Sequence, residues 1–186
     1  MKIGPKYRFP FKRRLKEQTD YKNRLKLLLS KKPRLVVRKS LKHMRAQIIE
    51  FHPEGDKVLV SAFSQDLKKL GWDSSTSNIP SSYLVGLLIG KKALKKKIKT
   101  CILDTGLQTN IKGSRIYAVL RGVIDAGLDI SYSPDVLPAD ERIKGQHILN
   151  YEKSLDKKKS KNQFSKNDPK KIPNMFENVK SKIMKE

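Results

Sequence analysis

The chain has 186 residues, and its 42 lysines and arginines against 18 acidic residues give a formal net charge of +24. This length favours one domain with extensions, and so much like charge repels itself unless a polyanion neutralises it, either nucleic acid or, less often, an anionic membrane. The single cysteine, Cys101, excludes an internal disulfide and a cysteine-built zinc site, and the longest apolar run, residues 83–90, is too short to span a membrane.

Most of the excess charge lies at the two ends of the chain. Residues 1–45 carry 17 basic and 2 acidic side chains, whereas residues 46–151 carry 14 and 11, and residues 152–186 carry 11 and 5. The middle therefore has the charge balance of an ordinary globular domain, and the basic ends are suited to bind a polyanion. We expect a basic RNA-binding arm at residues 1–18, a core domain at 19–152 and a Lys-rich C-terminal extension at 153–186.

The first fifteen residues alternate cations with aromatic rings. Gly4, Pro5 and Pro10 argue against a regular helix in this segment. Cations contact phosphates and ring faces stack on bases, so the pattern favours an extended RNA-tracking arm over a disordered solubilising tail. The candidate RNA-binding residues of the arm are Lys6, Arg8, Lys12, Arg13 and Arg14.

An amphipathic helix with a basic face is predicted next. Thr19 or Asp20 caps its start, and the Lys32-Pro33 pair ends it. Its apolar positions are Tyr21, Leu25, Leu28 and Leu29. A charged helix face is usually only solvated, but this face adjoins the basic arm, which favours a role in RNA binding.

Three strand-like runs follow, at residues 35–38, 43–51 and 57–64, with a hairpin turn signal at residues 53–56. In the third run, alternation places Val58, Val60 and Ala62 on one face of the sheet. The connection between the first two runs is surrounded by five potential cations, which predict a cradle for phosphates. These five are Arg38, Lys39, Lys42, His43 and Arg45.

The second half of the core reads as helix, strand and helix. A short helix at 65–70 precedes a longer one capped by Asn78, in which Gly86 and Gly90 permit close approach of a sheet or a second helix. Residues 100–104 form a short apolar strand, Ser114 caps a helix closed by Gly127, and a last helix spans about 139–151. Strands followed by this order predict an α/β fold with a mixed β-sheet packed with helices, whose last strand is parallel to a neighbour.

The chain offers no pattern typical of an enzyme. Residues 103–106 reproduce the short aspartic-protease signature, but that chemistry needs two carboxylates that share a proton, and the sequence has no second copy. His43, His52 and His147 do not have the spacing of metal ligands, and there is no phosphate-binding loop or nucleophile elbow. We therefore expect no catalytic residue, no cofactor and no metal.

Short motifs run through the chain in the order seen in the archaeal and eukaryotic branch of the ribosomal protein L-eighteen family. The motifs are Arg13-Arg14, Thr19-Asp20-Tyr21, Arg24-Leu25, Lys32-Pro33-Arg34-Leu35-Val36, Arg38-Lys39-Ser40, Lys42-His43, Arg45-Ala46-Gln47, Gly71-Trp72, residues 78–90, residues 125–130, Asp135-Val136-Leu137 and Gly145-Gln146-His147-Ile148. The chain resembles this family, which binds 5S ribosomal RNA, over roughly residues 1–152. Each piece is short, but the ordered set is specific.

The resemblance implies a structural, non-enzymatic protein of the cytoplasmic large ribosomal subunit. In the central protuberance it would bind 5S rRNA, link it to the large-subunit (23S-type) rRNA and adjoin the L-five protein family, with no membrane partner. On the matching positions it implies RNA contacts at Arg13, Arg14, Tyr21, Arg24, Arg38, Lys39, Ser40, Lys42, His43 and Arg45, although Tyr21 could instead belong to the core. The alternative is a basic module that binds non-ribosomal RNA or an acidic partner.

The last segment, residues 153–186, departs from the shorter pattern expected of archaeal members. It is rich in Lys, Asn and Ser, with three consecutive lysines at 157–159. Apolar residues recur at helical spacing near its end, which predicts a docking helix at residues 173–185. These residues are Ile172, Met175, Phe176, Val179 and Ile183. A tail that is disordered off the ribosome is the alternative.

Overall fold

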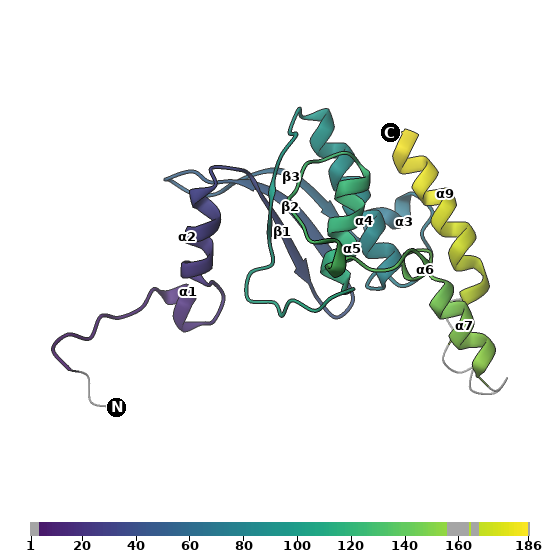
Figure 1. Ribbon diagram of the computed structural model, residues 1–186, viewed down its shortest axis with the longest axis horizontal. Helices are drawn as coiled ribbons and strands as arrows, with labels where there is room; N and C mark the ends of the chain where they lie inside the picture. Colours follow the sequence, from purple (N-terminus) through teal and green to yellow (C-terminus); the bar gives the residue numbers. More distant parts are fainter. Residues whose placement is uncertain (1–3, 156–163, 165–167, 186) are drawn as a thin grey trace.

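The computed structural model describes residues 4–155, 164 and 168–185. Its centre is a four-stranded sheet in the order β3-β2-β1-β4, made of β1 (Arg34–Lys39), β2 (Met44–Glu50), β3 (Lys57–Phe63) and β4 (Ile102–Asp104). β2 is antiparallel to both β1 and β3, whereas β4 is parallel to β1. The predicted α/β fold with a mixed sheet is therefore confirmed (Figure 1).

Two long helices cover one face of the sheet. α4 (Ile79–Lys95) and α5 (Arg115–Asp125) lie side by side and pack against β1, β2 and β3. Leu35 and Val37 of β1 and Ile48 of β2 are fully buried beneath them. The opposite face carries the alternate residues of each strand, including Arg45 and Gln47, and we call it the open sheet face.

Small residues let α4 and α5 approach each other closely. A Cβ at Gly86 would overlap the backbone carbonyl of Val119, and a Cβ at Gly122 would overlap that of Tyr83. The predicted close approach at Gly86 is therefore made to a second helix. A well-formed cap starts α4, because the Asn78 side chain accepts a hydrogen bond from the Ser81 N–H at 2.9 Å.

The remaining helices lie along the edges of this core. They are α1 (Lys12–Leu15), α2 (Tyr21–Leu29), α3 (Asp66–Lys69), α6 (Asp140–Ile143), α7 (Gln146–Ser154), α9 (Ile172–Lys185) and the 3₁₀ turns η1 (Pro134–Val136) and η2 (Pro169–Lys171). Asp20 resolves the ambiguous cap of α2, because its carboxylate accepts from the Asn23 N–H at 3.1 Å. Ser114 occupies the N-cap of α5, but its hydroxyl makes no capping bond within the described part of the chain.

The prediction that the N-terminal arm contains no regular helix is wrong at its end. α1 forms one helical turn, with Phe11 at its N-cap position. Pro5 and Pro10 both precede that turn, so neither removes a hydrogen bond within it.

The expectation that Val58, Val60 and Ala62 share one face is also wrong. Ile48 pairs with Val60 and the next residue, Ile49, pairs with Val58, so Leu59 is the extra residue of a β-bulge. The bulge turns Val58 to the open sheet face, where it is 47% exposed, while Val60 stays in the core.

The single helix predicted at residues 139–151 is instead two helices. α6 ends at Ile143 and α7 begins at Gln146, with Gly145 between them at φ +80°. A residue in this left-handed conformation interrupts the helical hydrogen bonds, and glycine adopts it without strain.

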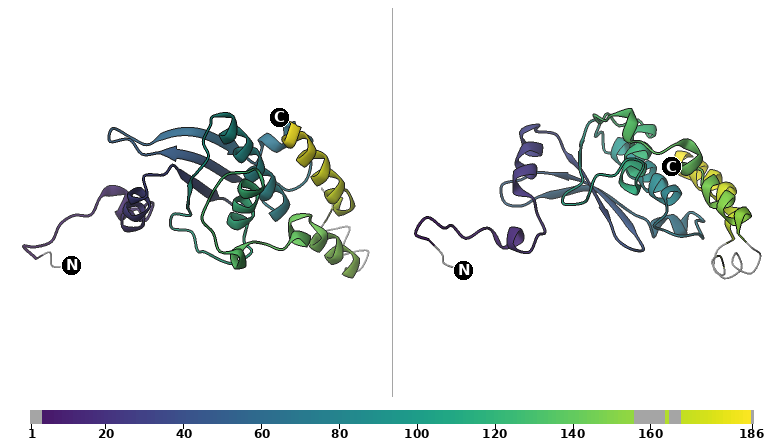
Figure 2. Two further views of the ribbon diagram at one scale, coloured as in Figure 1. Left: turned by 45° about the horizontal axis from the view of Figure 1, so that its top comes forward. Right: turned by 60° about the horizontal axis from the view of Figure 1, so that its bottom comes forward.

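The C-terminal helix packs on the core, as the docking-helix prediction required. Ile172, Phe176, Val179 and Ile183 of α9 are buried, and the Phe176 ring lies 5.6 Å from the Tyr83 ring of α4. Figure 2 shows α7 and α9 at the same end of the molecule, opposite the N-terminal arm. The lysines at 157–159 lie outside the described residues.

Candidate nucleic-acid interface

The N-terminal arm projects away from the core (Figure 1). Its cations and its rings are exposed. Lys6, Arg8, Lys12 and Arg14 are all exposed. Tyr7 and Phe9 of the arm lie 5.3 Å apart edge to face, and the Phe11 ring lies 5.0 Å from the Tyr21 ring of α2. Tyr21 is half-buried by this contact and not by the main core.

Helix α2 adjoins the sheet without burying an apolar face. Every residue of α2 keeps part of its surface exposed, and Leu25 and Leu29 are 62% and 75% exposed. The predicted amphipathic helix is present, but its leucine stripe is largely open. Its described attachment to the hairpin turn is ionic, through Arg24 and Asp56.

A network of arginines and aspartates joins α2, the sheet and the hairpin turn. Arg34, whose side chain is 4% exposed, donates from Nη1 to Asp104 Oδ2 at 2.7 Å and from Nη2 to Asp56 Oδ2 at 2.6 Å. Arg24 Nη2 donates to the other Asp56 oxygen at 2.9 Å, and Arg38 Nη2 to the other Asp104 oxygen at 3.3 Å. Three cations against two carboxylates leave the network with one net positive charge.

Three predicted RNA-binding arginines meet at a cleft beside this network. The cleft has a volume of about 250 Å³, and Arg13, Arg24 and Arg38 line it together with Arg34, Asn23 and Gln47. The carboxylates of Asp20, Asp56 and Asp104 also line it, so the four arginines leave the cleft with one net positive charge. Arg13 is oriented by a hydrogen bond from its Nε to the Thr19 hydroxyl at 3.0 Å. Thr19 also lines the cleft. Positive charge and amide groups in one concavity suit a phosphate or the polar edge of a nucleotide.

The predicted phosphate cradle between β1 and β2 is a tight turn held from several sides. Ser40 N–H donates to the His43 carbonyl at 2.9 Å, and the His43 N–H donates to Ser40 Oγ at 3.0 Å. Thr76 donates from its hydroxyl to the Lys42 carbonyl at 2.7 Å, and Arg115 donates to the Ser40 carbonyl at 3.3 Å. The turn therefore presents its exposed tip, Leu41 and Lys42, from a fixed backbone.

Arg38 and Arg45 stand directly opposite each other on the open sheet face, a pairing of like charges that is unfavourable by itself. Each has a different partner. Arg38 also donates from Nη1 to the carbonyls of Val37 and Asp104, whereas the Arg45 guanidinium carbon lies 5.3 Å from the Phe63 ring centroid. Lys39, the remaining cation of β1, is half-buried.

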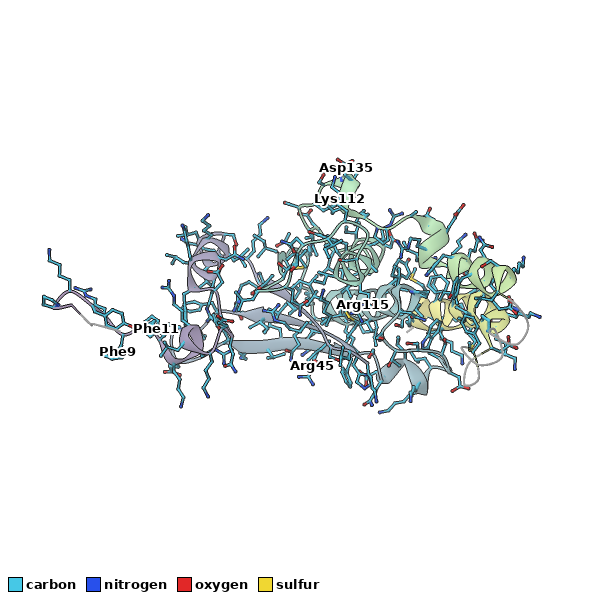
Figure 3. The ribbon with its side chains drawn as sticks, turned by 90° about the horizontal axis from the view of Figure 1, so that it is seen from below. Phe9, Phe11, Arg45, Lys112, Arg115 and Asp135 are labelled. Carbon is cyan, nitrogen blue, oxygen red and sulfur yellow. The ribbon has the colours of Figure 1, made fainter. Side chains whose placement is uncertain are left out.

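The predicted RNA-binding residues thus form two groups, one on the arm and around the cleft and the other at the turn between β1 and β2. The open sheet face joins the two groups. Figure 3 places Phe9 and Phe11 at one end of the molecule and Arg45 and Arg115 nearer its middle. Arg38 lies between the groups, because it lines the cleft and also pairs opposite Arg45. The arm, the cleft, the open sheet face and the turn form one candidate interface.

Sequence reasoning missed several residues that organise this interface. Arg34, Asp56 and Asp104 hold the network, and Phe63 supports Arg45. For Arg34 the sequence shows only a charged residue at the border of an apolar strand, and such a residue is buried only where it is paired. Asp104 belongs to the protease-like signature, and here its carboxylate binds Arg34, Arg38 and the Gly106 N–H.

Within the described part of the chain, no cluster of His, Cys, Asp and Glu could hold a metal ion. Among those same residues, no helix is both long and apolar enough to cross a membrane.

Comparison with known proteins agrees with this architecture. The family model described as "Ribosomal large subunit proteins 60S L5, and 50S L18" matches residues 5–100 and 95–133. The "Large ribosomal subunit protein uL18" of Methanococcus maripaludis is 44% identical over 191 residues, an alignment that covers 99% of both chains. The chain belongs to this family, and it is a structural constituent of the large ribosomal subunit and not an enzyme.

The family predicted from the ordered motifs is therefore confirmed. The expectation that residues 153–186 depart from the archaeal pattern is wrong, because the alignment with the archaeal relative extends over 99% of each chain. The packing of α9 on α4 agrees with this result, since a helix that completes the core is not an appended tail.

Proposed function

We propose that the chain binds 5S rRNA and links it to the large-subunit rRNA in the central protuberance, beside a protein of the L-five family. The observation that carries the proposal is the arm with its exposed cations and rings, continuous with an arginine-lined cleft. Such a surface neutralises phosphates with side-chain cations and stacks rings on unpaired bases. The thirteen residues proposed to contact RNA remain those predicted from the sequence.

The intramolecular bonds divide these residues by role. Lys6, Arg8, Lys12 and Arg14 are exposed on the arm and suited to contact phosphates directly. Arg24 and Arg38 are already bound to carboxylates, so they would contact RNA with their remaining donors or by exchanging Asp56 or Asp104 for a phosphate.

The salt dependence of binding tests this proposal. If the chain neutralises six to ten phosphates, its affinity for 5S rRNA should fall by roughly 10³–10⁵ between 50 and 200 mM salt, by the estimate for duplex DNA. An affinity for 5S rRNA that barely changes with salt would contradict it.

Removal of residues 1–15 tests the role of the arm. The described residues of this segment, 4–15, contribute no side chain to the hydrophobic core, so the shortened chain should keep its core folded while binding 5S rRNA more weakly. Equal loss of stability and binding would mean that the arm is structural. Co-sedimentation with large subunits after a moderate-salt wash separates this function from a free-standing module that binds other RNA or an acidic partner.

A further inference from the structure

Three side chains form a compact group on the open sheet face. Phe63 ends β3 and pairs opposite Arg45 of β2, and His43 precedes Arg45 by two residues, on the same side of the chain. The Arg45 guanidinium carbon lies 5.3 Å from the Phe63 centroid, and the His43 ring lies 5.1 Å from it at 48°. A cation and an imidazole therefore both rest against one benzyl ring.

Arg45 differs from the network arginines in its partner. In the described residues no carboxylate lies within ion-pair distance of Arg45, although Arg24 and Arg38 each have one and Arg34 has two. Its side chain is exposed and rests on Phe63 instead. Because a guanidinium is planar, a group held against a ring on one side can accept a second flat π surface on the other.

The hydrogen bonds around His43 determine which ring nitrogen carries its proton. Thr76 uses its hydroxyl hydrogen on the Lys42 carbonyl at 2.7 Å, so its oxygen can only accept from His43 Nδ1, 3.1 Å away. Ser64 Oγ, 3.3 Å from the same nitrogen, accepts from the Met44 N–H and keeps a free lone pair and its own hydrogen, so the direction is set by Thr76. Nδ1 is thus a donor, and Nε2 of the neutral ring is left as an acceptor.

We propose that this group binds one unpaired RNA base. The base stacks on the outer side of the Arg45 guanidinium, above Phe63, and donates an N–H to His43 Nε2. The inference rests on the RNA-binding function proposed above and specifies the kind of nucleotide that the open sheet face takes.

The chemistry of the group favours a base over a phosphate. A phosphate would be attracted by Arg45, but it has no flat surface to stack and no hydrogen to give to an acceptor nitrogen. A nucleobase offers both a π face and an exocyclic or ring N–H. The surrounding positive charge of Arg38, Lys39 and Lys42 favours a nucleic acid over a neutral aromatic side chain of a protein.

The test uses the full chain, 5S rRNA, and a fully paired RNA duplex of similar length. Phe63→Leu and Arg45→Lys keep the charge of the protein but remove the ring or the planar cation. Each should weaken binding to 5S rRNA by roughly five- to 100-fold, the range for loss of one stacked base. The slope of affinity against salt and the affinity for the duplex should stay unchanged, because no phosphate contact is lost.

The acceptor role of His43 has its own pair of variants. His43→Gln retains an oxygen that can accept a hydrogen bond, whereas His43→Leu does not. The glutamine variant should bind 5S rRNA more tightly than the leucine variant. The matched control is Tyr132→Leu, which removes an exposed ring three positions before Asp135 in the sequence. Figure 3 shows Asp135 at the opposite edge of the molecule from Arg45.

The outcomes distinguish this inference from the function on which it rests. If the unaltered chain fails to bind 5S rRNA, the proposed function is wrong, and the base site falls with it. If the unaltered chain binds and Phe63→Leu and Arg45→Lys bind equally well, only the base site is wrong. The base site is also wrong if the Phe63 and Arg45 variants lose as much affinity for the duplex as for 5S rRNA, or if the Tyr132 control loses as much affinity as they do. If these variants keep their affinity for 5S rRNA but no longer co-sediment with large subunits, the group binds another partner and the base site is wrong as well.

Discussion

Arg34 on β1 and Asp104 on β4 form a buried ion pair, with Arg34 Nη1 2.7 Å from Asp104 Oδ2. The two residues are 70 positions apart in sequence, and the parallel pairing of β1 with β4 brings them together. Asp56 binds the same guanidinium from the hairpin turn. Arg34 therefore joins β4 to the hairpin turn, and its two carboxylate partners also bind Arg24 of α2 and Arg38 of β1, both of which line the cleft.

Loss of the Asp104 carboxylate should destabilise the fold. Asp104→Asn leaves the buried Arg34 cation with only Asp56 as a carboxylate partner. Because one carboxylate remains, the expected cost is about 1–3 kcal/mol, the range for a buried donor that loses its acceptor. Denaturant unfolding measures the free-energy change. Asp135→Asn, at an exposed position of η1, should change it by less than about 0.5 kcal/mol. Equal effects would mean that the network contributes little to stability.

Two arginines of the interface should behave differently when truncated. Arg14 is exposed on the arm, so Arg14→Ala should lower the slope of log affinity against log salt by about one and leave unfolding unchanged. Arg38→Ala should also destabilise the fold, because Arg38 bonds Asp104 and two carbonyls. Salt titrations with 5S rRNA and thermal unfolding of both variants are the measurements. If Arg14→Ala and Arg38→Ala change the unfolding temperature equally, the different roles given to the two arginines are wrong.

A methyl group at the α4–α5 crossing should be poorly tolerated. Gly122→Ala would force its Cβ onto the Tyr83 carbonyl, so the helices must separate, at a cost of about 1–3 kcal/mol or more. Gly4→Ala is the matched change, because nothing lies within 4 Å of a Cβ there. Thermal unfolding of both variants is the measurement, and an unchanged midpoint for Gly122→Ala would show that the crossing is looser than described.

The C-terminal helix should contribute to the stability of the core. Phe176→Ala removes a buried ring from the α9–α4 contact and should cost about 3–5 kcal/mol, while Met184→Ala, at an exposed position of the same helix, should cost little. Chemical denaturation compares the two. A chain that unfolds identically with and without residues 168–186 would refute the role given to α9.

The buried thiol gives a prediction about pH. Burial is the main cause that raises the pKa of Cys101, to about 12, so the folded protein should not react with thiol reagents at pH 8. The unfolded thiol has an ordinary pKa near 8.5, and the unfolded state therefore loses its proton first. Stability from this group is complete below that pKa and declines as the pH rises from about 9 toward 12. Rapid labelling of the native protein at pH 8 would contradict this placement.

Local signals in the sequence were sufficient for most elements of the fold. The cap at Asn78 and the spacing of apolar residues in α4, α5 and α9 act within a few positions, so they can be read without a structure. For α2 the sequence narrowed the cap to Thr19 or Asp20, and the structure selects Asp20. The bulge at Leu59 could not be predicted, because it depends on how β3 pairs with β2. The break at Gly145 was missed because glycine near a helix does not by itself indicate the left-handed conformation.

The interface was only partly accessible to sequence reasoning for a similar reason. Basic charge on the arm is a local property, so the exposed cations there could be identified. Which arginines are already ion-paired depends on distant partners: Arg24 and Asp56 are 32 positions apart, and Arg38 and Asp104 are 66 apart. The support of Arg45 by Phe63 likewise requires the register of β2 with β3.

The RNA-binding role is tested by identifying the RNA that remains bound to the tagged chain after purification from its source cells with a moderate-salt wash. We expect 5S rRNA to be recovered in roughly equimolar amount, accompanied by large-subunit rRNA when the ribosomes are left intact. Recovery of RNA without enrichment of 5S rRNA over its share of total cellular RNA would contradict it.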